Sequence, residues 1–542
     1  MLCAKNDLLA PKKRMKAKDI RASVPVAVGL LLIMIFSVSL EWRGIDWMNG
    51  YGPKPNHSFN IDDNRFVDAA QEFKRPELNK VGYPEGMTTQ LFLVATAAEK
   101  LLGLEVNYPA ALRGISVIWA QFALLITFFL GRWFGLSSPA ALLSAFFLAV
   151  SPLFVLLANQ GTPDVAALGL FYATVLAAME ANRRNSSQWF YATCFFAGIC
   201  LAVKFLIPAV VPVLILVLRS DTSRMLERAF LAACIGLTSF CAANFFNFTP
   251  WDFWRLLKML VFDNVIIVGG KSPPQQVALY ARDLLAATGL VTSIPALVFL
   301  VGRMIRRASV WRHNLAEISN LRPVTATRMI WTWTGQPAAL LVLPLLAHLF
   351  LIFTAQIHAM RHILVCVPLM CVAAAAMFDQ LAWRRFGLLR KCGAVLTLSA
   401  LVLWGVANAW MTAYPYWHDI RMDMVKYLRK NAAPTTTHYF YAHVEGSTLI
   451  STNPESDRYV TCDGDYARYL ANTDASQVWH GIGGQERVDF LHALFEGRTS
   501  YRPVLVLERE RLSLEDRLAG KKWLEDLSAF YATKCVIFER RS

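Results

Sequence analysis

Residues 159–208, NQGTPDVAALGLFYATVLAAMEANRRNSSQWFYATCFFAGICLAVKFLIP, decide the fold class. They hold two apolar runs, Val165–Ala181 and Trp189–Val203, which are separated by the basic pair Arg183–Arg184. Long runs with almost no charge are typical of membrane-spanning helices. A short basic loop between two such runs is expected on the cytoplasmic side.

The composition of the whole chain points the same way. The 542 residues are 55% hydrophobic and 17% charged, whereas soluble proteins carry about 25% charged residues. The net charge of +15 would suggest nucleic acid in a soluble protein. Here the basic residues sit in short clusters between apolar runs, so they indicate membrane topology and we expect no nucleic-acid partner.

Similar runs recur along the chain and predict about eleven spans. The first, Val24–Leu40, follows a basic N-terminus and lacks a small-residue cleavage site, so we interpret it as an anchor with residues 1–22 in the cytoplasm. The other predicted spans lie at roughly Pro109–Leu130, Pro139–Leu157, Val165–Ala181, Trp189–Val203, Phe205–Leu218, Ala229–Phe248, Leu284–Val301, Ala338–Phe353, Ile363–Leu381 and Gly393–Trp410.

Two segments leave the topology ambiguous. Tyr83–Leu102 is long enough to span, but as a span it would move every later basic loop to the outer side, so we interpret it as an interfacial helix. The stretch Trp189–Leu218 is one long helix or two short ones broken near Lys204 and Pro208. Two short helices keep the basic loops in the cytoplasm. The predicted transmembrane domain is then 23–413, with a first outer loop at 41–108.

The tail, residues 414–542, changes character. Its polar sequence alternates helical and strand patterns, which predicts a small soluble α/β domain on the outer side. Its two cysteines, Cys462 and Cys535, either pair in an oxidising compartment or stay unpaired. The predicted elements are the helices Asp419–Lys430 and Glu486–Leu494 and the strands His438–Tyr441, Val504–Glu508 and Val536–Glu539.

Three aspartates at the outer ends of apolar segments are candidates for acid–base chemistry. Asp62 and Asp63 precede a helical pattern, in which Phe66 and Val67 are expected to rest on the membrane surface. Asp164 follows Pro163 at the beginning of an apolar run. Each acid also suits a helix N-cap, which needs no catalytic role.

Cationic side chains on the same predicted side are candidates for binding an anion. Lys204 lies between two apolar runs without polar neighbours, so it needs a partner or an anionic ligand unless it snorkels to the surface. Arg361, flanked by His358 and His362, opens a span and suits a phosphate or lipid headgroups. Lys271 lies in VGGKSPPQQ, whose glycine spacing does not fit a nucleotide-binding loop.

Seven short motifs follow one another in a characteristic order. They are NIDD (Asn60–Asp63), YPEG (Tyr83–Gly86), TPD (Thr162–Asp164), AVKF (Ala202–Phe205), a Gly/Pro-rich loop (Gly269–Pro274), an arginine opening a late span (Arg361–Pro368) and a polar helix (Asp419–Lys430).

This order resembles the GT-C superfamily of membrane glycosyltransferases, in the branch of protein O-mannosyltransferases and the lipid A aminoarabinose transferase. The resemblance implies a GT-C-type helical bundle and transfer of a sugar, with inversion, from a polyprenyl-phosphate donor such as undecaprenyl phosphate-sugar to an acceptor. Where members often have HPDE, this chain has Asn60 and Ile61, and Asp63 replaces the usual glutamate. These departures put in question whether the acceptor and any metal are those usual in the family.

The resemblance also implies roles for the candidates. Asp62 would be the general base, and Asp63 with Asp164 would position the acceptor or the base. Asp62 and Asp63 would also be the ligands of any divalent cation, Mg²⁺ or Mn²⁺. The donor phosphate would be bound by Lys204, Arg361, Lys271 and Tyr83, with His358 and His362 in supporting positions on the acceptor side.

Several alternatives stay open. The acceptor is a glycan, a lipid or a protein, and the expected setting is a bacterial inner membrane with the site and the tail in the periplasm. A lipid-linked oligosaccharide polymerase or ligase is a second enzyme class, although the arginine-rich outer loops typical of it are missing from the sequence. A transporter or flippase would use Asp164 and Lys204 as a buried coupling pair, but no internal repeat supports it.

Overall fold

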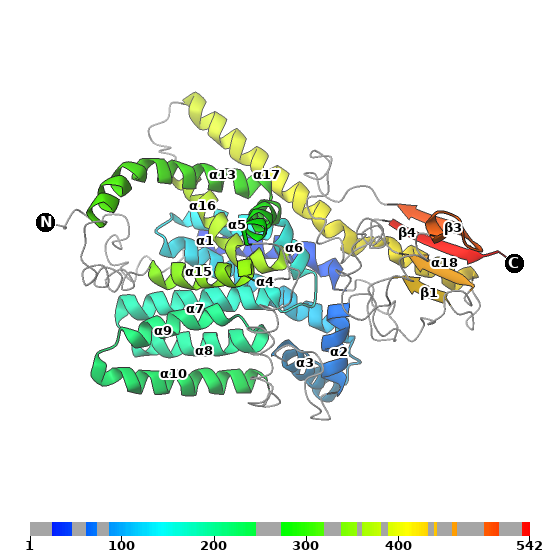
Figure 1. Cartoon of the computed structure of the whole chain (residues 1–542), viewed down its shortest axis with the longest axis horizontal. Coiled ribbons are helices and arrows are strands. Elements are labelled where there is room, and N and C mark those ends of the chain that lie inside the picture. The colour runs from blue at the N-terminus through cyan, green and yellow to red at the C-terminus, as the bar shows by residue number, and fades with distance from the viewer. Residues whose placement is uncertain are drawn as a thin grey trace.

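The structure of the protein, a computed structural model, describes residues 24–45, 61–72, 86–244, 273–318, 338–354, 360–380, 388–431, 438–441, 458–462, 493–508 and 534–541. At Asp62 and Asp63 only the backbone is described. Helices predominate in these residues, and a small sheet lies near the C-terminus (Figure 1). The predicted class, a mainly α-helical membrane protein, is confirmed.

Within the described ranges, 7 helices are long and apolar enough to cross a membrane. They are α1 (Val24–Glu41), α4 (Tyr108–Trp133), α7 (Asp164–Arg184), α10 (Thr222–Ala243), α13 (Pro273–Ile318), η5 with α16 (Met360–Cys366 and Val367–Gln380), and α17 (Leu388–Trp417).

The other predicted spans coincide with a bent pair and with shorter apolar helices. The pair bends by 64°. These elements are α5 (Ser138–Ala149) with α6 (Pro152–Ala158), α8 (Ser187–Val203), η3 with α9 (Ile207–Val210 and Val211–Leu218), and α15 (Ala339–Thr354). Every predicted apolar run therefore coincides with helix, and the number of true membrane crossings stays a prediction.

Local sequence explains where several helices begin, end or bend. The side chain of Asn107 accepts a hydrogen bond from the Ala110 amide at 3.2 Å, and Pro109 occupies the first turn of α4. α7 ends at Asn185, which has the left-handed φ of 47° that terminates many helices. Gly289, with φ of 71°, divides α13 into two segments because only glycine adopts this conformation easily.

α7 lies in the middle of the bundle. Of its most apolar window, 89% is buried, which explains why the helix is apolar on all sides. It packs against α4 and α8, and Figure 1 shows α7, α8 and α10 running alongside one another. The outer-loop motif TPD and the basic pair Arg183–Arg184 therefore mark opposite ends of one central helix.

Two helices of the predicted first outer loop are α2 (Ile61–Glu72) and α3 (Gly86–Leu102); α3 packs against α8 and α10, and α2 packs against α3 and α4. Figure 1 shows α2 upright and α3 nearly end-on, whereas α7, α8 and α10 run horizontally. The helix predicted within Tyr83–Leu102 is present as α3, and its interfacial position stays a prediction. The face of α2 differs from the expectation: Phe66 and Val67 are 4% and 0% exposed and belong to the protein core. They pack there because α2 rests on α3 and α4.

The tail contains a four-stranded sheet of order β1-β2-β4-β3. β1 pairs parallel with β2, and β4 pairs antiparallel with both β2 and β3. One helix, α18 (Ile420–Asn431), packs Met424 and Leu428 against the sheet. The strands are β1 (His438–Tyr441), β2 (Tyr459–Cys462), β3 (Tyr501–Glu508) and β4 (Lys534–Arg540).

Three strands and one helix of the tail match the sequence prediction, whereas β2 was not predicted. β2 has four residues, like β1, but lacks the run of aromatic side chains that marks β1, and it is held between β1 and β4 by tertiary pairing. Cys535 is 1% exposed, and the strand register aligns Cys462 with its neighbour Val536. Whether the two cysteines pair stays an open alternative. The predicted helix Glu486–Leu494 lies almost entirely outside the described residues.

Candidate functional site

The TPD motif places a carboxylate at the end of the central helix. Asp164 is the first residue of α7 and directly follows Pro163. Asp164 is 4% exposed and the neighbouring Thr162 is 1% exposed. A carboxylate removed from water to this extent needs a cationic or hydrogen-bonding partner, so its surroundings are informative.

Lys204 supplies that partner. α8 ends at Val203 because Lys204 has an extended backbone, with φ of −149° and ψ of 126°. Lys204 Nζ donates a hydrogen bond to Asp164 Oδ1 and forms an ion pair with it. The lysine side chain is 24% exposed and the aspartate side chain 2%. An ammonium group has three donor hydrogens, so Lys204 can contact an anionic ligand while it keeps its bond to Asp164.

A second cationic side chain comes from a distant part of the chain. Arg361 lies in η5, the short helix that precedes α16. Lys204, Arg361 and His362 all lie close enough to Asp164 to interact with its charge. The structure therefore brings two of the predicted phosphate-binding cations to one buried carboxylate.

Two hydrogen bonds fix the position of η5. Tyr280 Oη lies 3.2 Å from His362 Nδ1, and His348 Nε2 lies 2.8 Å from the carbonyl oxygen of His362. Tyr280 and His348 are 1% and 6% exposed. These bonds tie α13 and α15 to the turn that carries Arg361. Neither Tyr280 nor His348 belongs to the seven sequence motifs. The sequence contains one indication of His348, which is a polar side chain inside the apolar run Ala338–Phe353.

The first outer loop reaches the same place through α3. Gly86, the last residue of YPEG, lies so close to α8 that a β-carbon on it would be 2.7 Å from the carbonyl oxygen of Ala202 and 3.1 Å from Val203 Cα. Only glycine allows this approach. The YPEG motif therefore ends against the residues that immediately precede Lys204.

The remaining predicted site residues are less fully described. The backbone of Asp62 and Asp63 lies in the first turn of α2, which packs against α3 and α4. Tyr83, Lys271 and His358 lie outside the described residues. Among the residues that are described, no three His, Cys, Asp or Glu side chains gather as metal ligands. Cation binding by Asp62 and Asp63 therefore stays a prediction.

Arg113 and Glu41 are among the buried charged residues that were not predicted. Arg113, 0% exposed, donates hydrogen bonds to the carbonyl oxygens of Gly44 and Ile45 at 3.4 and 3.3 Å. Glu41 is 1% exposed and accepts hydrogen bonds from Ser37 Oγ at 2.7 Å and from Gln121 Nε2 at 3.3 Å. The sequence did indicate that Arg113 has a structural or functional role, because an arginine inside the apolar run Pro109–Leu130 needs a buried partner. These contacts fasten the beginning of the first outer loop to α4.

Part of the chain matches a known family. Residues 101–245 match the family model described as dolichyl-phosphate-mannose-protein mannosyltransferase. This segment contains Asp164 and Lys204 and covers the helices from α4 to α10. The match confirms the resemblance to GT-C glycosyltransferases that the order of motifs predicted. No curated protein matches the chain by sequence.

Solved structures of two such enzymes are similar to this chain. ArnT from Cupriavidus metallidurans bound to undecaprenyl phosphate is 14% identical, with a TM-score of 0.43 over 83% of this chain and 94% of that chain. The same protein in the apo state is 14% identical, with a TM-score of 0.44 over 82% of this chain and 95% of that chain. The S. cerevisiae protein O-mannosyltransferase Pmt1-Pmt2 complex bound to the sugar donor is 16% identical, with a TM-score of 0.34 over 44% of this chain and 34% of that chain. These likenesses are too distant to say what this chain binds.

Proposed function

We propose that the protein is a membrane glycosyltransferase that takes a sugar from a polyprenyl-phosphate donor and transfers it to an acceptor on the periplasmic face, with inversion. The observation that carries this proposal is the meeting of Asp164, Lys204 and Arg361 at one end of the bundle. The family match over residues 101–245 supports the same reaction class. The proposed setting is a bacterial inner membrane.

The proposed donor site uses the two cations. When the bond between the anomeric carbon and the phosphate oxygen breaks, negative charge grows on the leaving polyprenyl phosphate. Lys204 and Arg361 would stabilise that charge, since fixed cations in a site with little water act strongly on developing charge. The partly exposed side chain of Lys204 is accessible to such a ligand, while buried Asp164 holds its ammonium group in place. Lys271 and Tyr83 would complete the phosphate contacts.

The proposed acceptor site uses the first outer loop. Asp62 would remove the proton from the acceptor nucleophile, which then attacks the anomeric carbon from the side opposite the phosphate. Asp63 would orient the acceptor or bind a divalent cation with Asp62. The packing of α2 on α3, and of Gly86 against α8, supports a loop that is held beside Lys204.

The primary test measures transfer and donor binding separately. The full-length protein in lipid nanodiscs is given a panel of undecaprenyl-phosphate sugars together with candidate acceptors of each class, a glycan, a lipid and a protein, and the release of undecaprenyl phosphate is followed. Asp62→Asn should abolish release while donor binding and membrane insertion persist, because the change keeps the size and removes the base. A fully active Asp62→Asn protein would exclude the proposed base.

A second measurement tests the cations. Lys204→Ala and Arg361→Ala should chiefly weaken binding of undecaprenyl phosphate, by about tenfold or more, as expected for the loss of a charge-assisted hydrogen bond. Arg183→Gln, at the other end of α7, is the matched control and should bind normally. If Lys204→Ala and Arg361→Ala changed only the affinity for the acceptor, these residues would belong to the acceptor site and not to the donor site.

The buried Asp164–Lys204 pair also favours a second candidate, a transporter that couples movement of a lipid-linked glycan to this pair. The two functions differ in chemistry. A transporter would move a fluorescent lipid-linked sugar across proteoliposomes without breaking the sugar–phosphate bond, whereas a transferase releases polyprenyl phosphate only when the acceptor is present.

A further inference from the structure

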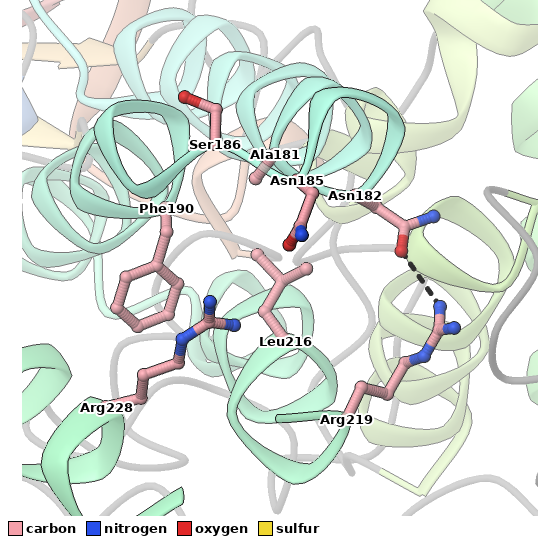
Figure 2. Close-up of a pocket in the computed structure, with 8 residues that line it drawn as sticks. All are labelled: Ala181, Asn182, Asn185, Ser186, Phe190, Leu216, Arg219 and Arg228. Atoms are coloured by element: carbon pink, nitrogen blue, oxygen red, sulfur yellow. Dashed lines mark hydrogen bonds between the residues drawn. The ribbon is translucent and has the colours of Figure 1, made fainter. Parts of the chain in front are cut away.

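A pocket lies at the end of the bundle remote from the candidate site (Figure 2). Its volume is about 230 Å³, and it is bounded by the end of α7, the start of α8, the end of α9 and the start of α10. Since α8 has 17 residues, the pocket is about 26 Å from Lys204 along this helix. The lining residues are Ala181, Asn182, Asn185, Ser186, Phe190, Leu216, Arg219 and Arg228.

Two arginines enter the pocket from different elements. Arg219 follows α9 and donates a hydrogen bond to Asn182 Oδ1 at 2.9 Å. Arg228, on α10, donates to Ser220 Oγ at 3.0 Å and lies with its guanidinium carbon 5.5 Å from the centre of the Phe190 ring. Figure 2 shows the two guanidinium groups on either side of Leu216. The two arginines thus meet an amide, a hydroxyl group and an aromatic ring at this end of the bundle.

The rest of the described lining is also neutral or donates hydrogen bonds. None of the eight lining residues is acidic. Asn185 has a left-handed backbone, which turns the chain sharply between α7 and α8. The side chain of Ser186, the N-cap of α8, makes no capping hydrogen bond. Amide groups in the first turn of a helix attract anions, so this helix start adds to the positive potential of the arginines.

Neighbouring arginines show that this arrangement is specific to the pocket. Arg183 and Arg184 both pair with Glu180, at 2.6 and 2.7 Å. They do not line the pocket. Partial burial lowers the pKa of Arg219, because it removes the guanidinium group from water. An anion in the pocket would offset this loss of hydration.

We propose that this pocket binds the phosphate group of an anionic ligand, with Arg219 and Arg228 as its charged contacts. Arginine suits phosphate because its planar guanidinium group donates two parallel hydrogen bonds. The apolar surface beside the pocket favours a lipid as the source of the phosphate: Leu218 and Leu226 are 51% and 77% exposed. A soluble phosphate has the same headgroup chemistry and is distinguished below. The proposal does not depend on the proposed transfer reaction.

The test is native mass spectrometry of the full-length protein with phosphatidylglycerol, phosphatidylcholine or inorganic phosphate added separately. The wild-type protein should retain phosphatidylglycerol in preference to phosphatidylcholine. Arg228→Gln and Asn182→Asp should weaken that binding by about tenfold or more, the order expected when charge-assisted hydrogen bonds are lost. Asn182→Asp gives Arg219 a carboxylate in place of an amide. The new negative charge should repel an anionic ligand, while the melting temperature of the protein stays unchanged or rises.

Arg183→Gln is the control, because it removes one positive charge from the same end of the bundle outside the pocket. It should bind phosphatidylglycerol within about twofold of the wild-type protein. Equal retention of both lipids, or equal weakening in all three variants, would overturn the proposal. If inorganic phosphate binds to the wild-type protein, is lost in Asn182→Asp and displaces phosphatidylglycerol, the phosphate chemistry is supported and a soluble ligand is the source.

Discussion

The two ends of the α7–α8 pair carry cationic side chains in different electrostatic settings. At one end, the ammonium group of Lys204 contacts the buried carboxylate of Asp164, with Arg361 close by. At the other end, Arg219 and Arg228 contact an amide, a hydroxyl group and an aromatic ring. The first arrangement holds a cation at a fixed position beside a carboxylate, and the second presents two cations in a pocket whose lining residues include no carboxylate.

The difference shows that residue type alone does not define a phosphate site. A carboxylate beside a lysine fixes its orientation and lowers the net charge of the site, which suits a reaction in which charge appears during the chemistry. Arginines among neutral groups attract a ligand that is already charged. The following predictions test this contrast, from the largest expected effect to the smallest.

The largest effect is expected at the buried ion pair. Lys204→Met leaves Asp164 without its ion-pair partner and should lower the free energy of unfolding by about 2 kcal/mol, less than for a fully enclosed pair because the lysine is partly exposed. Asp164→Asn should have a similar effect. In a double-mutant cycle followed by thermal unfolding, the double variant should be less destabilised than the sum of the single variants. Additive effects would mean that the pair does not couple.

Gly86→Ala tests the contact between the first outer loop and α8. The new β-carbon would meet the Ala202 carbonyl oxygen at 2.7 Å, so α3 must move. We expect a loss of about 1–3 kcal/mol in stability and weaker binding of undecaprenyl phosphate. Gly114→Ala, on α4, is the matched control because its β-carbon would meet nothing within 4 Å. Its stability should be unchanged or slightly higher, since alanine favours helix.

Tyr280→Phe tests how Arg361 is positioned. The change removes the hydroxyl group that lies 3.2 Å from His362 Nδ1 and should cost about 0.5–1.5 kcal/mol of stability. Donor affinity should fall severalfold, while the pocket at the other end should retain phosphatidylglycerol normally. Tyr191→Phe, on an exposed tyrosine of α8, serves as the control. If Tyr280→Phe left donor affinity unchanged, the contact between Tyr280 and His362 would not be needed to position Arg361.

The smallest effect is expected at the exposed ion pair beside the phosphate pocket. Arg183 and Glu180 have side chains that are 30% and 16% exposed. Arg183→Gln should change the free energy of unfolding by no more than about 0.5 kcal/mol, because water already solvates this pair. A loss as large as that of Lys204→Met would contradict the contrast between the two ends.

Much of the fold could be predicted from the sequence because hydropathy and helix boundaries are local properties. The apolar runs coincide with helices, and the break expected near Lys204 and Pro208 separates α8 from η3 and α9. β2 escaped prediction because its pairing with β1 and β4 is a tertiary contact that its own four residues do not encode. The face of α2 that was expected on the membrane is buried, since an apolar face looks the same in sequence whether lipid or protein covers it.

The sequence by itself determined that helices form, where they end and which acids and cations lie at one predicted side of the membrane. It also supplied the resemblance to a family whose model matches residues 101–245, the segment that contains TPD and AVKF. The tertiary structure decided which of these side chains meet. Asp164 pairs with Lys204, Tyr280 meets His362, and Arg219 and Arg228 share a pocket, because helix packing joins positions whose separation along the chain carries no signal of contact.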